Sequence, residues 1–579
     1  MKTIIFVLSF LIASMAFAQD LLVEDPSSLD KIERAGLSLS LQVFRKHAEN
    51  NQKLFENIVY QSLVNDLDQD LKELQKSDPK LGVGMKYTHR LFDIRWLKSP
   101  AAHFELVGVV NRMDRAVFDP GSCGELRLIY RLSYEKQQNG TLVTSRLPLT
   151  INTVYLLPAA PGCMTIAKAL ATLNERTVKE WATSANLKSV EMNLQAVRWP
   201  STVRGDMGGH AEYIMRVYRA LPNGGLKLSP LENTPNLELL RDPAKKKELL
   251  SWLLKPENIQ ALDQGVLNIP EKFLTGKTAS FALHGMNRLA NRPFDLIFKK
   301  EDFASIDYSK LKNIYGASSL RRRLNDMSCV GCHQGRTIAG FHFLGKDSAK
   351  TVFANSIFSS QSPHMIEELP RRQKYVEAVL KGQTPDNSRP FSERDPQRPG
   401  KMNDYCGLGS EYKAWACASG LKCIPVITPG NNAEIGECLP DSRIAGNPCE
   451  PGSISQTANA HKDYLKDALA MSCGNQNHCE TTRVGFPGGM CSGGCDNLKV
   501  GETCGAIADL YGLNNCLAKK RPFTACLAEN TRPGSLQACD EFTPCRSDYI
   551  CMRTKAGKGA CIPPYFLFQL RVDGHPDPL

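Results

Sequence analysis

The stretch LRLIYRLSYEKQQNGTLVTSRLPLTI, residues 126–151, contains two runs in which apolar side chains recur at every second position. The first run covers residues 126–134 and the second covers residues 143–151. This period is typical of strands that bury one face. Asn139-Gly140, between the runs, is a strong signal for a tight hairpin turn. The stretch therefore predicts two long antiparallel strands.

The alternation extends outward from this hairpin, from about residue 104 to residue 231. We therefore expect an antiparallel β domain over residues 82–235, with a sandwich as its candidate architecture. Cys123 and Cys163 lie in loops rich in Gly and Pro at the edges of this domain. A disulfide between them would stabilise the fold by a few kcal/mol. Further polar residues of the domain share no spacing that would link them in a catalytic site, so we interpret them as ordinary polar groups: His103, Glu125 and His210.

Helical spacing of apolar residues replaces the alternation on both sides of the β domain. Residues 19–81 and 236–304 show this spacing, which predicts helices in both segments. Residues 383–404 are charged and rich in Pro, and they have no apolar period. We interpret this segment as a linker.

Residues 1–18 have the features of a bacterial signal peptide. Lys2 precedes an apolar run, and Ala16-Phe17-Ala18 is a small-x-small cleavage site. The run is too short to span a bilayer, and charges or Pro interrupt the later apolar stretches, so no transmembrane segment is expected. The net charge of +11 comes from scattered Lys and Arg, and we expect no nucleic-acid partner. The expected location is the periplasm or the medium.

The distribution of the 20 cysteines supports export, because sixteen of them lie between Cys406 and Cys561. This density is typical of secreted disulfide scaffolds. The spacing C-x5-C occurs three times, each time followed by a cysteine that has Gly two positions before it. This repetition predicts small stapled modules, whose pairing the sequence leaves open. The repeated positions are Cys417, Cys423 and Cys438; Cys473, Cys479 and Cys491; and Cys545, Cys551 and Cys561.

The motif Cys329-Val-Gly-Cys332-His333 stands outside these modules. Two thiols three residues apart lie on one side of a helical turn, where they can reach the two vinyl groups of one haem. The His that follows is then placed as the proximal iron ligand. A zinc site would need further ligands in a reduced setting, a redox dithiol would need a βαβ context, and a structural disulfide would leave His333 unexplained. We therefore expect one haem c per chain.

The surroundings of this motif resemble the cytochrome c superfamily over residues 305–382. Residues 319–327 are similar to the helix before the attachment site, and residues 340–345 loosely resemble the loop after it. Phe341 replaces the usual Pro of that loop. Residues 370–380 resemble the closing helix of the family. The resemblance implies a small helical haem domain that transfers electrons.

The same resemblance places the distal iron ligand just before the closing helix. Met365 fits the order of the family, in which Met precedes that helix, and His364 is its neighbour. His342 is a third candidate, and an open site is a fourth alternative. The arginines of Arg321-Arg322-Arg323 and Arg336 could pair with haem propionates or could lie on a solvated face.

The expected architecture is therefore multidomain: an antiparallel β domain, an α-helical cytochrome c-like domain and C-terminal disulfide-rich small modules. The expected function is electron transfer to a redox partner protein that the sequence does not identify. The alternatives are a haem enzyme with an open distal site for peroxide or a small gas, and an extracellular binding protein whose Cys-rich modules are primary. The expected segments are a signal peptide (1–18), a helical segment (19–81), the β domain (82–235), a helical connector (236–304), the haem domain (305–382), a linker (383–404) and the Cys-rich modules (405–579).

Overall fold

The structure is a computed structural model of the full chain. The expected signal peptide lies outside the described residues. The described residues are 20–201, 203, 210–282, 285, 288–334, 345, 363–389, 398–425, 434–441, 443–450, 473–474, 477–486, 488–493, 537–539, 545–546, 549–553, 559–563 and 568–579.

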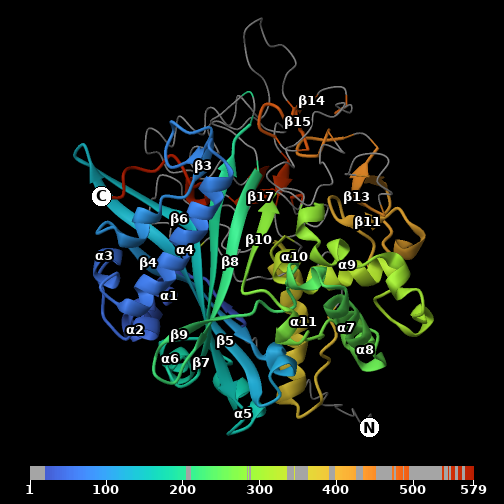
Figure 1. Ribbon diagram of the computed structural model, residues 1–579, viewed down its shortest axis with the longest axis horizontal. Coiled ribbons are helices and arrows are strands. Elements are labelled where there is room, and N and C mark those ends of the chain that lie inside the picture. Colours follow the sequence, from blue (N-terminus) through green and yellow to red (C-terminus); the bar gives the residue numbers. More distant parts are fainter. Residues whose placement is uncertain are drawn as a thin grey trace, which may run out of the picture.

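A single ten-stranded sheet forms the centre of the molecule (Figure 1). Seven strands follow the order β1-β4-β5-β6-β7-β3-β2, while β8 pairs with β7, β9 and β10. All pairs are antiparallel except β2 with β3. The bounds are β1 Leu22–Val23, β2 Leu81–Gly82, β3 His89–Leu91, β4 Ala102–Arg112, β5 Ser122–Gln138, β6 Thr141–Pro158, β7 Leu187–Trp199, β8 His210–Ala220, β9 Leu226–Ser229 and β10 Lys277–Ala282.

The expected hairpin is confirmed as β5 and β6. Gln138 lies opposite Thr141, so Asn139 and Gly140 form a two-residue turn. Both have positive φ, 49° and 73°, which is the conformation that makes Asn-Gly favourable in such turns. The register that this turn sets holds as far as Ser133, and a shift between Arg131 and Ser133 then places Tyr130 opposite Ile151.

Helices, and not a second sheet, cover the apolar face of the sheet. The alternating residues of β5 and β6 are buried together with residues of α4 in one core. In α4 the buried residues Tyr60, Leu63, Val64, Leu67 and Leu71 recur at helical spacing, which gives one continuous apolar stripe. The sandwich architecture is therefore wrong, while the helical segment is confirmed. The covering helices are α1 Pro26–Ile32, α2 Leu39–Phe44, α3 Asn51–Leu54 and α4 Ile58–Ser77.

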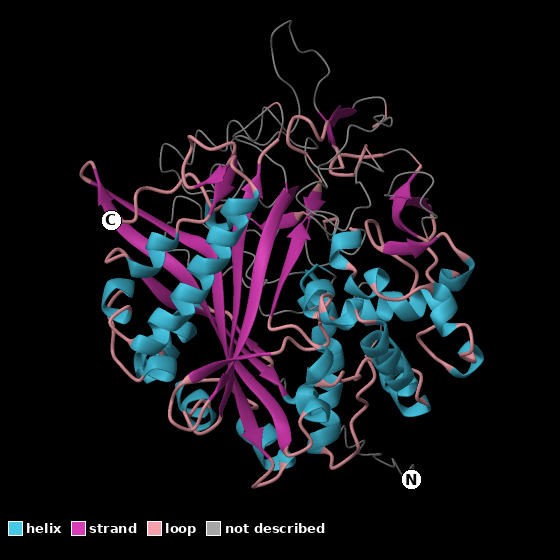
Figure 2. Ribbon diagram, in the orientation of Figure 1, coloured by secondary structure: helices cyan, strands magenta, loops and turns pink. Residues whose placement is uncertain are grey.

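A second group of helices lies on the other side of the sheet (Figure 2). Leu320 and Leu324 of α9 share a core with Leu249 of α7 and Leu262 of α8. The boundary expected between residues 304 and 305 falls inside this core. The remaining bounds are α5 Cys163–Ala169, α6 Glu175–Trp181, α7 Pro243–Leu253, α8 Pro256–Gln264, α9 Ala317–Met327, α10 Cys329–Gln334 and α11 Pro363–Leu380.

The disulfides of the C-terminal region repeat one connectivity. In each of three modules the first cysteine pairs with the third and the second with the fourth. The third and fourth cysteines face each other across neighbouring strands. The pairs are Cys406–Cys423 and Cys417–Cys438, Cys449–Cys479 and Cys473–Cys491, and Cys539–Cys551 and Cys545–Cys561. The strands are β11 Tyr405–Gly407, β12 Leu421–Pro425, β13 Ile435–Pro440, β14 Asn477–Glu480, β15 Met490–Gly493, β16 Ala538–Cys539, β17 Ile550–Arg553 and β18 Gly559–Ile562.

The glycine two positions before the last cysteine of a module stands where a side chain would clash with its neighbours. In the first module, a Cβ on Gly436 would overlap the carbonyl oxygen of Ile424 on the neighbouring strand. In the second, Gly489 has a φ of +68°, and a Cβ there would lie 2.6 Å from the sulfur of Cys449. A larger residue at Gly436 would push apart two paired strands, and one at Gly489 would displace the Cys449–Cys479 disulfide.

Disulfides of this number are typical of an oxidising, extracellular or periplasmic location. The expected Cys123–Cys163 disulfide is also present. Among the described residues, no helix combines the length and the apolar character that crossing a bilayer requires.

Candidate cofactor site

The CVGCH motif lies on the short helix α10, which follows α9 directly. Ser328 separates the two helices and has extended backbone angles. Its hydroxyl accepts a hydrogen bond from the amide of Gly331 at 3.1 Å and donates one to the carbonyl of Asn325 at 2.6 Å. A serine in this position is a favourable N-cap. The cap fixes where α10 begins and thus where its cysteines point.

The two residues between the cysteines anchor α10. Val330 is buried against Met215 of β8 and Leu231. Gly331 packs against the end of α9 so closely that a Cβ would overlap the carbonyl oxygen of Asn325. With both intervening residues facing the protein, Cys329 and Cys332 face a cavity together.

Gly331 should therefore be intolerant of any side chain. We expect Gly331→Ala to lower the free energy of unfolding by about 1–3 kcal/mol, because α10 must move away from α9. Gly121→Ala is the matched control, since nothing lies within 4 Å of a Cβ there. Urea unfolding of both variants tests this, and equal midpoints would contradict the proposed packing.

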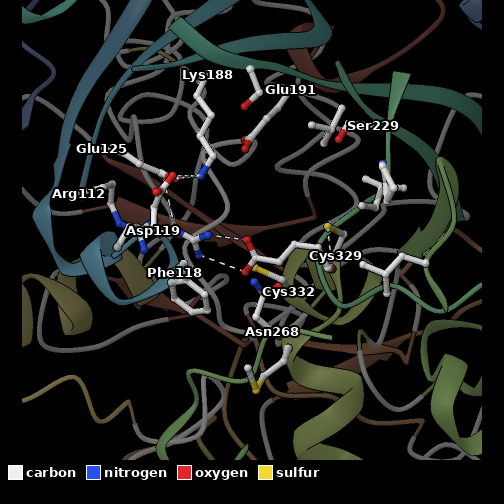
Figure 3. Close-up of a pocket in the computed structure, with 18 of the residues that line it drawn as sticks. Arg112, Phe118, Asp119, Glu125, Lys188, Glu191, Ser229, Asn268, Cys329 and Cys332 are labelled. Carbon is white, nitrogen blue, oxygen red and sulfur yellow. Dashed lines mark hydrogen bonds and ion pairs between the residues drawn. The ribbon is translucent and has the colours of Figure 1, made fainter. Parts of the chain in front are cut away.

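The cavity has a volume of about 440 Å³, within the range of cofactor sites. One wall is the sheet, through residues of β5, β7 and β8, and the opposite wall is formed by α9 and α10. Cys329 and Cys332 lie on one side of it, while Arg112, Asp119 and Glu125 lie on the other (Figure 3). The site is therefore shared between the sheet and the helical region.

A network of ion pairs crosses the sheet wall of the cavity. Glu125 lies 2.7 Å from Arg127, 3.1 Å from Lys188 and 3.5 Å from Arg115. Arg115 also pairs with Glu232 at 2.5 Å. Burial alone would raise the pKa of Glu125, but the three cations outweigh it and hold the pKa well below its usual range. The carboxylate is therefore charged at neutral pH.

The two motif cysteines differ from the other described cysteines, because both remain thiols while the rest form disulfides. The amide of Cys329 donates to Thr234 Oγ1 at 2.9 Å, and its thiol lies 3.5 Å from the carbonyl of Glu232. Burial, and secondly the charge of Glu232, raise the pKa of Cys329 well above its usual value. Cys329 is therefore a neutral thiol at physiological pH.

The structure brings Cys329 and Cys332 together, and His333 follows them on α10. The side chains of His333, His364 and Met365 lie outside the described set, as do residues His342 and Arg336. The closing helix was expected to begin at Pro370, which is wrong. It begins at Pro363, because Pro at the first position needs no amide partner, and it continues through Pro370. His364 and Met365 therefore lie in its first turn.

The arginines of the motif's preceding helix serve mainly in packing. Arg321 donates to the carbonyl of Phe298 at 3.1 Å. Arg322 lies over the ring of Tyr405, 6.0 Å from its centre. Arg323 lines the cavity but donates to backbone carbonyls, among them that of Leu262 at 3.1 Å.

Sequence reasoning missed the charged wall of the cavity, including Glu125, Arg127 and Glu191. Glu125 was interpreted as an ordinary polar group. The available signal was that charged residues take alternate positions in the middle of an otherwise apolar strand. On a strand buried on both faces, such residues require charged partners.

No protein-family model, no curated protein and no solved structure matches this chain. The function is therefore argued from the site itself.

Proposed function

We propose that this protein carries one haem c, bound by thioether bonds to Cys329 and Cys332 with His333 as the proximal iron ligand. The haem would supply a one-electron ferric–ferrous couple. Residues 305–382, which share their cores with the preceding helices and the sheet, would then supply the haem ligands, with Met365 or His364 as the distal ligand. The protein would act in electron transfer outside the cytoplasm, after removal of a signal peptide near Ala18, with a redox partner of unknown identity.

The observation that carries this proposal is the pair of thiols on one helical turn at the wall of a cavity of cofactor size. The buried anchors Val330 and Gly331 hold both sulfurs toward that cavity. Haem attachment requires this placement, because both vinyl groups belong to one rigid ring. The described cysteines of the Cys-rich modules pair among themselves, so they do not compete for these thiols.

Thiol–disulfide exchange is a weaker explanation of the same pair. Exchange requires a thiolate, and catalytic thiols of this kind have lowered pKa values. The pKa of Cys329 is shifted in the opposite direction by burial and by Glu232. A buried neutral thiol is compatible with addition to a vinyl group assisted by a maturation system.

The residues around the cavity would give the haem a dry, charged setting. The sheet wall contributes fixed ion pairs around Glu125 and Arg127, which need no rearrangement when an electron arrives. These charged groups also favour a second candidate function, a haem enzyme, because charged side chains could orient peroxide beside an open iron site.

The visible spectrum of protein produced in a host with a cytochrome c maturation system tests both candidates. We expect a haem band that survives denaturation and a molecular mass increased by one haem. A low-spin ferric spectrum supports electron transfer, with a far-red charge-transfer band supporting Met365 and its absence His364. A high-spin spectrum supports the enzyme, and a protein without haem would contradict the proposal.

A further inference from the structure

Helix α9 ends at the cofactor site and begins against the first Cys-rich module. Its C-terminal residues Arg323, Asp326 and Met327 line the cavity together with the motif cysteines. Its N-terminal end contacts the first module (residues 398–425 and 434–441), whose strands β11 and β13 lie beside α9 in Figure 1. The module therefore contacts the helix that forms one wall of the cavity.

Two glutamates of the first module bind the first turn of α9. Glu411 accepts a hydrogen bond from the amide of Ser319 at 2.9 Å. Glu434 accepts one from the hydroxyl of Ser318 at 2.8 Å. Gly316, just before the helix, lies so close to Glu411 that a Cβ there would overlap the carboxylate. Because the first amides of a helix lack intrahelical partners and its dipole favours anions, these contacts stabilise the start of α9.

The fold of the first module keeps the two glutamates in place. The amides of Leu408 and Gly409 donate to the carbonyl of Glu434 at 2.8 and 3.2 Å, which joins the two loops that carry the glutamates. The described hydrophobic core of the module is small, and it consists of Tyr405, Tyr412, Trp415 and Ile435. A segment of a few tens of residues with so small a core depends on disulfides to stay folded. Reduction of both disulfides of the module should therefore release α9.

An open hollow in the surface of the first module leads to both of its disulfides. The hollow has a volume of about 470 Å³, and its lining includes half-buried Cys417 from one disulfide and half-buried Cys423 from the other. The exposed Lys413 also lines it, and a cation beside a disulfide favours the approach of a thiolate. By contrast, all four cysteines of the third module are buried. A small thiol should therefore reach the first module before the third.

We propose that the first module is a redox-sensitive clamp on the cofactor site, opened by a small dithiol that enters this hollow. A thiolate of the dithiol attacks Cys417 or Cys423 and forms a mixed disulfide, which the second thiol of the reagent then resolves. Each protein disulfide gains two electrons and two protons, and the dithiol becomes a cyclic disulfide. The two glutamates then leave α9, and the cavity wall that carries the motif cysteines loosens. This inference goes beyond the proposed function and does not require bound haem.

Amide hydrogen exchange of the full-length protein, with and without dithiothreitol, tests the clamp. Alkylation and peptide mass mapping identify which disulfides have been reduced at each reductant concentration. We expect the two disulfides of the first module to be reduced before those of the third. Exchange in α9 and α10 should then rise by at least about fivefold, as the loss of a helix cap of typical strength predicts. Exchange in α4, which covers the opposite face of the sheet, should stay unchanged.

Glu411→Ala separates the clamp from other effects of the reductant. It removes the carboxylate that binds Ser319 and should raise exchange in α9 and α10 by about fivefold without any dithiol. Reduction of this variant should add less than reduction of the wild type does. Glu257→Ala is the matched control, because Glu257 is an exposed acidic residue in the first turn of α8. It should leave exchange in α9 and α10 as in the wild type.

Two results would overturn the clamp. One is reduction of the first module without faster exchange in α9, and the other is an equal rise in α4, which would indicate general unfolding. Reduction of the third module before the first would refute access through the hollow. A protein without haem would refute the proposed function and leave this test unaffected.

Discussion

Replacement of both Cys329 and Cys332 with alanine is expected to abolish covalent haem completely. The two thiols are the proposed attachment points and line the cavity, while the other described cysteines are held in disulfides. No described side chain beside the cavity offers a further thiol. The variant should either bind no haem or bind haem that denaturation releases, so it should lack the haem absorption band that survives denaturation in the wild type.

The matched control for this variant is Cys123→Ala/Cys163→Ala, which also removes two sulfurs. These residues form a disulfide between β5 and α5, and neither of them lines the cavity. The control should retain covalent haem and lose about 3–4 kcal/mol of stability, as the loss of a disulfide predicts. A covalent haem band in the Cys329→Ala/Cys332→Ala variant would refute the attachment site.

The second large effect is expected at Asp573, which anchors the C-terminal segment to the sheet. Its carboxylate accepts from Arg198 at 2.8 and 3.1 Å and from Arg571 at 3.2 Å, and Arg90 lies 3.3 Å away. Its side chain is 2% exposed. Removing the carboxylate would leave the buried arginines around it without a counter-charge. Asp573→Asn should therefore lower the free energy of unfolding by about 3–5 kcal/mol.

The contribution of Asp573 to the free energy of unfolding should decrease at acid pH. Burial alone would raise the pKa of Asp573, but Arg198 and Arg571 outweigh it and lower the pKa well below its usual value. The stabilisation is therefore present above the unfolded pKa of about 4 and is lost as the pH falls further. Asp573→Asn should lack this acid-dependent component.

Asp577→Asn is the control within the same segment. Asp577 is 61% exposed and pairs with Arg95 on the surface, where such pairs contribute at most about 1 kcal/mol. Urea unfolding at pH 7 and at about pH 3, below the unfolded pKa, measures both variants. Equal losses for Asp573→Asn and Asp577→Asn would show that the buried cluster does not anchor the segment.

Short-range patterns were sufficient for several features of this protein. The alternation around Asn139-Gly140 determined the β5–β6 hairpin, because strand period and turn geometry are properties of neighbouring residues. The repeated cysteine spacing determined that stapled modules exist. The CVGCH motif brought Cys329 and Cys332 to one side of a helical turn, and the structure has them there.

Other features depended on residues far apart in the chain. The disulfide connectivity of the modules follows from strand pairing, which spacing alone does not specify. The start of α11 at Pro363 was missed, because an internal Pro370 has the same local signal as a Pro at a helix start.

The sequence by itself thus determined the hairpin, the modules and the pair of thiols, while only the tertiary structure decided what surrounds them. Helices cover the apolar face of the sheet. The sequence did not predict this, because alternation in one strand indicates that a face is buried but not which elements bury it. Arg115 binds Glu232 in the cavity wall, and Asp114 binds Arg371 outside it, each pair across more than a hundred residues of chain. Buried charges choose their partners by distance in space, and that distance exists only after the sheet and helices have packed.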